Sequence, residues 1–278
     1  MNKVLLQTTK KIGQILFIGL LVSAVTFSLT SATIADGPTP QEMIKKMEKA
    51  MGGWNNMYDL KDVQFSYNYE YPGQNKRDHS IEKYIFEGEH SWAKYDVHQI
   101  NVMPDADGMV IQSYVHNQAA MSHEGKMMKD EASVGLSQFL RKANYYWFTM
   151  MYKLSDPGVE LSSMGTEAVN GINYEKVRVD FNAATVGKEV NDAYVLYINP
   201  TTNLVDQFLF SLPARGVNQP VILMKVEYQT VNGVKVPAKR SVYQPGPDGK
   251  LSTTPNLVQT SSNIKFNNGF TAADFMLK

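Results

Sequence analysis

The stretch DVQFSYNYEYPG, residues 62–73, alternates between apolar or aromatic side chains and polar ones. Successive side chains of a β-strand point to opposite faces, so each set occupies one face of the strand. A strand with one covered and one wet face is typical of an antiparallel sheet. The stretch therefore predicts such a strand, with an unusually aromatic covered face formed by Val63, Phe65, Tyr67, Tyr69 and Tyr71.

Similar patterns recur along the chain and predict a long antiparallel sheet. Asn170-Gly171 and Asn232-Gly233 are hairpin signals, because both residues of each pair tolerate positive φ. Further strands are expected at Ile81–Glu87, Ser91–Gln99, Met109–His116, Tyr174–Phe181, Ala193–Ile198, Leu204–Ser211, Val221–Gln229, Val234–Tyr243 and Leu257–Phe266.

Two helices are predicted beside this sheet. The first follows Thr39 as N-cap, with Pro40 in the first turn and Glu42 as capping-box partner, and it ends at Gly52. The second covers roughly 132–146 and leads into the cluster YYWFTMMY at 145–152. These elements predict the α+β class, with about ten or eleven strands in one domain.

The first 35 residues have the pattern of a secretory signal peptide. A head with three lysines precedes an apolar run from Ile12 to about Leu29, and the small residues Thr33 and Ala35 fit a cleavage site after Ala35. We therefore expect a mature domain over 36–278, with no integral membrane segment, in the periplasm or outside the cell. The alternative is that the apolar run is retained as a membrane anchor.

Charge and cysteine content restrict the partners of this domain. Removing three lysines leaves 24 basic and 27 acidic residues, a net charge of −3, and no basic stripe that would favour nucleic acid. The chain has no cysteine, so neither disulfides nor a lipid on an N-terminal cysteine are available. Stability must therefore come from packing.

The order of elements resembles a known group of exported proteins. The segments YYWFTMMYKLSDPGVELSSMGTEAVNGINYEKVRVDF (145–181), YVLYINPTTNLVDQFLF (194–210) and VNGVKVPAKRSVY (231–243) carry the resemblance, together with the ending FTAADFMLK. They are similar to the LolA/LolB-like superfamily of lipoprotein carriers, most closely to a bacterial periplasmic branch of unknown function. The resemblance implies a curved sheet, or half-barrel, wrapping an N-terminal helix, with a helical insertion as lid.

The same resemblance implies a cavity for the acyl chain of a lipid or lipoprotein. Methionine would suit such a lid, because its unbranched side chain repacks easily. Equally, the cluster at 145–152 can be ordinary core under a long connection. The candidate cavity and lid residues are Phe65, Tyr67, Tyr69, Leu140, Trp147, Phe148, Met150 and Met151.

No catalytic or metal motif emerges. HEGKM at 123–127 lacks the second histidine of a zinc-protease helix, and there is no nucleophile elbow, P-loop or dinucleotide fingerprint. His90, His98 and His116 fall on predicted strands and leave a metal site open as an alternative.

The sequence thus favours a non-enzymatic binding protein that holds a hydrophobic ligand and needs no cofactor. A structural or interaction module that recognises an envelope protein is one alternative. A hydrolase or metal-binding protein on the same scaffold is another.

Overall fold

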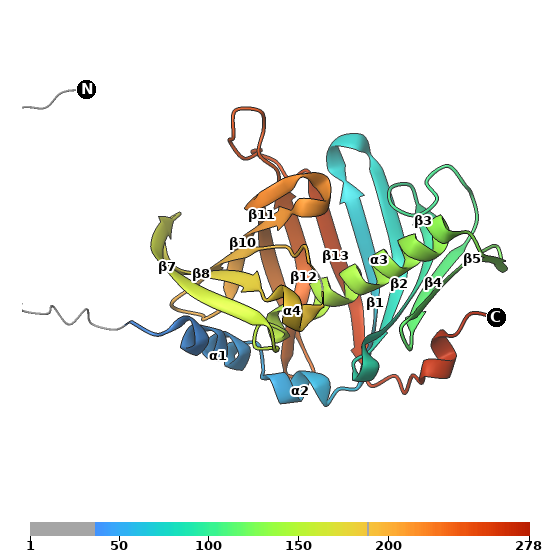
Figure 1. Cartoon of the computed structure of the whole chain (residues 1–278), viewed down its shortest axis with the longest axis horizontal. Coiled ribbons are helices and arrows are strands. Elements are labelled where there is room, and N and C mark those ends of the chain that lie inside the picture. Colours follow the sequence, from blue (N-terminus) through green and yellow to red (C-terminus); the bar gives the residue numbers. More distant parts are fainter. Residues whose placement is uncertain (1–36, 188) are drawn as a thin grey trace, which may run out of the picture. The chain divides into compact units, whose positions relative to one another are not determined.

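Thirteen antiparallel strands form one curved sheet in the computed structural model, which describes residues 37–187 and 189–278 (Figure 1). The α+β class and the curved antiparallel sheet are confirmed. The predicted signal peptide and its cleavage site lie outside the described residues. Residues Gly37–Lys278 form one compact unit. The strands are β1 Asp62–Tyr71, β2 Lys76–Ile85, β3 His90–His98, β4 Val110–Val115, β5 Gln118–His123, β6 Lys126–Met128, β7 Val159–Val169, β8 Ile172–Phe181, β9 Tyr194–Ile198, β10 Val205–Leu212, β11 Val217–Val231, β12 Val234–Tyr243 and β13 Leu257–Phe266.

The helices are short except for one. They are α1 Pro40–Ala50, α2 Trp54–Tyr58, α3 Glu131–Thr149 and α4 Ala183–Val186, with 3₁₀ turns η1 Pro72–Gln74, η2 Glu87–Glu89, η3 Met150–Tyr152, η4 Pro213–Arg215 and η5 Ala272–Phe275. The predicted capping box of α1 is confirmed: Thr39 accepts from the N–H of Glu42, and the Glu42 carboxylate accepts from the N–H of Thr39.

The order of the strands explains why α3 crosses the sheet. Strands β1 to β6 run outward from the centre to one edge, and β7 to β13 return from the opposite edge, so that β1 pairs with β13 in the middle. The segment between β6 and β7 must therefore reach from edge to edge. A 19-residue helix is about 28 Å long, whereas thirteen flat strands would span about 58 Å. Curvature reduces this distance, and α3 lies across the concave face against β3, β4, β5 and β12 (Figure 1).

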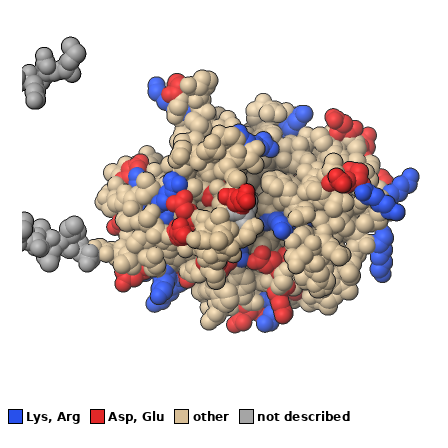
Figure 2. Space-filling view, in the orientation of Figure 1, with Lys and Arg blue, Asp and Glu red and all other residues tan. Residues whose placement is uncertain are grey.

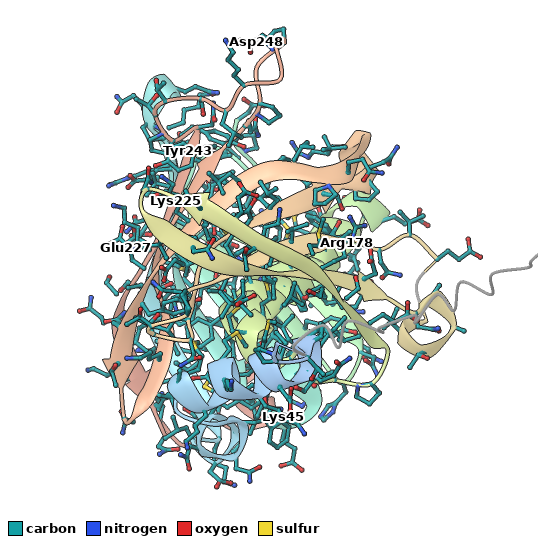
Figure 3. The ribbon with its side chains drawn as sticks, turned by 90° about the vertical axis from the view of Figure 1, so that its left-hand side faces the viewer. Lys45, Arg178, Lys225, Glu227, Tyr243 and Asp248 are labelled. Atoms are coloured by element: carbon teal, nitrogen blue, oxygen red, sulfur yellow. The ribbon has the colours of Figure 1, made fainter. Side chains whose placement is uncertain are left out.

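One main core fills the space between the helices and the concave face. Helix α1 contributes Met43, Ile44 and Met47, and the segment after α3 contributes Met150 and Met151. Figure 3 shows the yellow sulfur atoms gathered in this interior. The outer face is polar: the same view shows Lys225 and Glu227 pointing away from the core, and both are exposed.

Three strands were not predicted. Strand β7 is exposed along most of its length at the sheet edge, so its sequence has no apolar alternation. Strands β5 and β6 are short, and the turn before β5 uses His116 and Asn117 at positive φ without a glycine. Neither feature matches the usual hairpin signals.

Gly52 sets the position of α1 against the sheet. It has a φ of 111°, and a Cβ there would lie 2.5 Å from the carbonyl oxygen of Gly233 in the β11–β12 turn. We expect Gly52→Ala to lower the free energy of unfolding by about 1–3 kcal/mol, since both strain and a backbone clash would result. Denaturant titration measures the change. Gly135→Ala in α3, where a Cβ meets nothing within 4 Å, is the matched control and should stabilise by about 0.5–1 kcal/mol. Equal effects of both substitutions would contradict this account.

Candidate functional site

A buried ion pair fixes α3 to the concave face. Arg141, on the sheet-facing side of α3, donates from Nη1 to Oε2 of Glu82 on β2 at 2.5 Å, and neither side chain is exposed. Arg141 also donates to the hydroxyl of Tyr95 at 2.5 Å and to Oε1 of Gln112 at 3.3 Å. Glu82 accepts a further bond from Tyr84 at 3.0 Å. The network satisfies both charges away from water, which a buried ion pair requires.

The pKa of Arg141 reflects this arrangement. Burial alone would lower the pKa, because it disfavours the charged form, but the adjacent Glu82 carboxylate raises it to a net value above the ordinary one. The guanidinium therefore keeps its charge inside the protein. Helix α3 is consequently held in a fixed position over β2, β3 and β4, like a roof over the concave face.

A cavity of about 190 Å³, which we call the α3 cavity, lies between this roof and the sheet. Helix α3 supplies apolar side chains on one side, and β1, β10, β11, β12 and β13 supply the other. A few polar side chains are interspersed among them. The lining residues are Tyr67, Tyr69, Tyr71, Asp78, Tyr95, Asn101, Phe139, Leu140, Ala143, Asn144, Trp147, Phe210, Leu212, Arg215, Met224, Val242, Gln244, Leu257 and Gln259.

Trp147 forms one end of the α3 cavity. Its ring stacks on Phe208 with centroids 6.0 Å apart and meets Phe210 edge-on at 5.6 Å. Behind it lies a void of only about 10 Å³, lined in part by Met51, Met150 and Met151. Methionine side chains repack readily, so the region behind Trp147 can make room with little rearrangement of the backbone.

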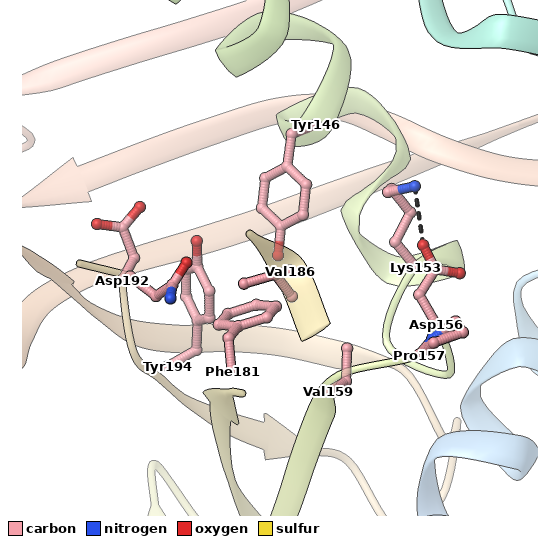
Figure 4. A pocket seen from close by; sticks show the side chains of 10 residues that line it. Tyr146, Lys153, Asp156, Pro157, Val159, Phe181, Val186, Asp192 and Tyr194 are labelled. Carbon is pink, nitrogen blue, oxygen red and sulfur yellow. Dashed lines mark ion pairs between the residues drawn. The ribbon is translucent and has the colours of Figure 1, made fainter. Parts of the chain in front are cut away.

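A second cavity, of about 270 Å³, lies beyond Tyr194. Tyr146, Phe181 and Tyr194 gather on one side of it, and the ion pair between Lys153 and Asp156, 2.8 Å long, lies on the other (Figure 4). The ring of Tyr194, which lines this cavity, lies 6.1 Å from the ring of Trp147, which lines the α3 cavity.

The predicted site residues divide into two groups. Tyr67, Tyr69, Leu140 and Trp147 line the α3 cavity. Phe148, Met150 and Met151 are buried in the main core behind Trp147 and border the small void.

The eighth predicted residue, Phe65, lines none of these cavities. It stacks on Phe148, with ring centroids 4.7 Å apart and nearly parallel planes at 13°. The cluster at 145–152 therefore contributes Trp147 to the α3 cavity, Tyr146 to the second cavity, and several core side chains.

Sequence reasoning missed the polar part of the α3 cavity. Asp78 accepts bonds from the backbone N–H groups of Ile100 and Asn101 at 2.8 and 2.9 Å. Gln259 lies on the buried face of β13 with 6% of its surface exposed. Where the inward-facing residue of a strand is polar and its neighbours are polar too, the sequence does not show which of them faces inward.

The three histidines considered as metal ligands do not converge. The rings of His90 and His116 are 4.7 Å apart, whereas both ring nitrogens of His98 face the backbone oxygens of Met103 and Gly108. In the described part of the chain, no group of three or more His, Asp or Glu side chains is placed to hold a metal ion.

Surface charge and the apolarity of the helices are two properties relevant to the partners of the protein. Basic and acidic side chains are interspersed over the face shown in Figure 2. Within residues 37–187 and 189–278, none of the helices combines the length and apolarity needed to cross a membrane.

The model of DUF6503, a family of unknown function, matches residues 29–253. The chain belongs to this family. No curated protein matches this DUF6503 member.

Solved structures resemble the DUF6503 chain in fold. A DUF1329 family protein from Desulfovibrio piger has a TM-score of 0.50 and 14% identity, over 87% of this chain and all of that one. An outer membrane lipoprotein-sorting protein domain from Vibrio parahaemolyticus has a TM-score of 0.50 and 10% identity, over 84% of this chain and 94% of that one. The predicted likeness to the LolA/LolB-like superfamily is thus confirmed for the fold.

Proposed function

We propose that this protein is an exported, non-enzymatic binding protein that holds the acyl chain of a lipid or lipoprotein in the α3 cavity. The observation that carries the proposal is an aromatic and aliphatic cavity that lies under a fixed helix and ends at Trp147, with a methionine-lined void behind it. Ligand sites are typically concave and mostly apolar, with a few polar groups. The α3 cavity has this character.

The size of the cavity defines what must happen on binding. Its volume of about 190 Å³ is below the range of about 300–1,000 Å³ typical of ligand sites. An acyl chain would therefore have to displace Trp147 toward Met51, Met150 and Met151. Each methylene that enters contributes about 0.8 kcal/mol, so a chain of moderate length can offset this rearrangement.

The placement of the protein outside the cytoplasm is part of the proposal. It rests on the signal-like pattern that ends at Ala35 and on the fold shared with a lipoprotein-sorting domain. In this setting an envelope protein that delivers or accepts the ligand would be a natural partner.

One observation favours the alternative, a structural or interaction module with a self-filled interior. Phe148, Met150 and Met151 are already buried in the core. If Trp147 stays in place, the cavity is too small for a lipid, and the exposed faces of the sheet would carry the function.

Binding of a dansylated undecanoic acid tests the two proposals. Purified protein should raise the fluorescence of this probe at a stoichiometry of one, and mass spectrometry should detect an acyl lipid that co-purifies. The acyl-binding proposal fails if no probe binds at any chain length and no lipid is found. A reproducible cross-linked protein partner in that case would support the interaction module.

A further inference from the structure

Arg240 on β12 is a buried cation without a carboxylate partner among residues 37–187 and 189–278. It has 5% of its surface exposed. Its Nη1 donates to the carbonyl oxygen of Trp147 at 2.6 Å, and its guanidinium lies 6.0 Å from the centre of the Trp147 ring. The other buried arginine, Arg141, is neutralised by Glu82. The guanidinium also hydrogen-bonds the side chain of Tyr67, but it has five N–H donors and no carboxylate beside it, so it retains capacity for an anion.

Gln259 lines the α3 cavity, and Arg240 lies directly beside it at the small void behind Trp147. In the pairing of β12 with β13, Arg240 is opposite Gln259, and in the pairing of β1 with β13, Tyr69 is opposite Gln259. Directly opposite residues have Cβ atoms about 4.5–5.5 Å apart on the same face. Gln259 lines the cavity, and its Oε1 is buried without a hydrogen-bond partner. This orphan atom is an acceptor, so Gln259 can hold a carboxylate only through its amide N–H₂ group, which is a donor.

Tyrosine hydroxyls complete this row of donors. Burial raises the pKa of Tyr67 to about 12, and burial likewise raises the pKa of Tyr69 above its ordinary value. Both hydroxyls consequently keep their protons at neutral pH and remain hydrogen-bond donors. Arginine, the glutamine amide and tyrosine together form a set that suits the two oxygens of a carboxylate.

The carboxylate of Asp78 determines where along the cavity a ligand anion can bind. Asp78 pairs across the sheet with Tyr69, on the side away from Gln259, and its carboxylate is already bound by the backbone of Ile100 and Asn101. A second anion would be repelled there and attracted toward Arg240.

We infer that the ligand is a single-chain fatty acid that binds head-first, with its carboxylate on Arg240 and Gln259. This inference rests on the proposed function, since it assigns the polar end of the same ligand. The chain then fills the α3 cavity between Leu140 and Leu257 and points toward the exposed Phe139 at the mouth.

The test compares laurate with methyl laurate and dodecanol, which have the same chain but no carboxylate. Displacement of a fluorescent acyl probe at pH 7.5 should show that the wild-type protein binds laurate roughly tenfold more tightly than either neutral ligand, as charge-assisted hydrogen bonds contribute that much. Arg240→Met should remove the preference, so that laurate and methyl laurate bind with equal affinity.

A second variant separates ligand binding from folding. Arg240 also holds α3 through the Trp147 carbonyl, whereas Gln259→Leu preserves that bond and should reduce the preference for laurate about threefold. Lys225→Met, on the outer face, is the control and should keep the full preference. Equal affinities for laurate and methyl laurate in the wild type would overturn the carboxylate assignment while preserving the acyl site. Failure of all three ligands to bind would overturn the proposed function as well.

Discussion

Replacement of Arg141 with methionine is expected to lower the free energy of unfolding by about 3–5 kcal/mol. The substitution leaves the Glu82 carboxylate buried and without its cation, and it removes the donors to Tyr95 and Gln112. For a domain of this size the loss corresponds to a fall of roughly 10 °C in Tm. Denaturant titration followed by tryptophan fluorescence measures it.

The matched control for Arg141 is an arginine in a partly exposed ion pair with aspartate. Arg178 and Asp180 on β8 are 2.8 Å apart and partly exposed to solvent. Arg178→Met should therefore lower the free energy of unfolding by less than about 1 kcal/mol. Similar losses at Arg141 and Arg178 would show that the ion pair under α3 does not fix the helix, and α3 would then be free to act as a moving lid.

Filling the α3 cavity should abolish most ligand binding without unfolding the protein. Ala143 lies on the cavity side of α3, so that Ala143→Trp places an indole where the acyl chain would lie. If three methylenes are excluded at about 0.8 kcal/mol each, the affinity for laurate falls about 50-fold. Probe displacement measures the affinity, and thermal unfolding monitors the fold.

Ala132→Trp provides the control on the same helix. Ala132 is exposed in the first turn of α3, away from the cavity lining. Its substitution should alter the affinity for laurate less than twofold. Unchanged binding in Ala143→Trp would place the ligand elsewhere, for example in the cavity beside Tyr194.

The sequence predicted the sheet because most of its strands have one wet face. Each predicted strand corresponds to an observed one, and Leu257–Phe266 has the observed bounds of β13. A strand was missed where its burial produces no alternation of apolar and polar residues in the sequence. Strand β7, exposed at an edge, contains Ser162, Ser163 and Glu167 and lacks the apolar alternation that would have predicted it.

The candidate site was predictable only in its apolar part. The aromatic alternation of β1 identified Tyr67 and Tyr69, and the cluster at 145–152 identified Trp147. The cluster could not reveal that Phe148 faces Phe65 in the core while Trp147 faces the cavity. Arg240 and Gln259 become neighbours only through the pairing of β12 with β13, which local sequence does not specify.

Quenching of Trp147 by a brominated fatty acid tests the acyl-binding account most directly. The chain has three tryptophans, and of these only Trp147 lines the α3 cavity. In a Trp54→Phe, Trp92→Phe protein, saturating 2-bromododecanoate, whose bromine lies beside the carboxylate and hence close to Trp147, should quench most of the remaining fluorescence, and Ala143→Leu, which narrows the cavity without adding a fluorophore, should weaken the effect. Unquenched Trp147 at saturating ligand would show that no acyl chain enters beneath α3.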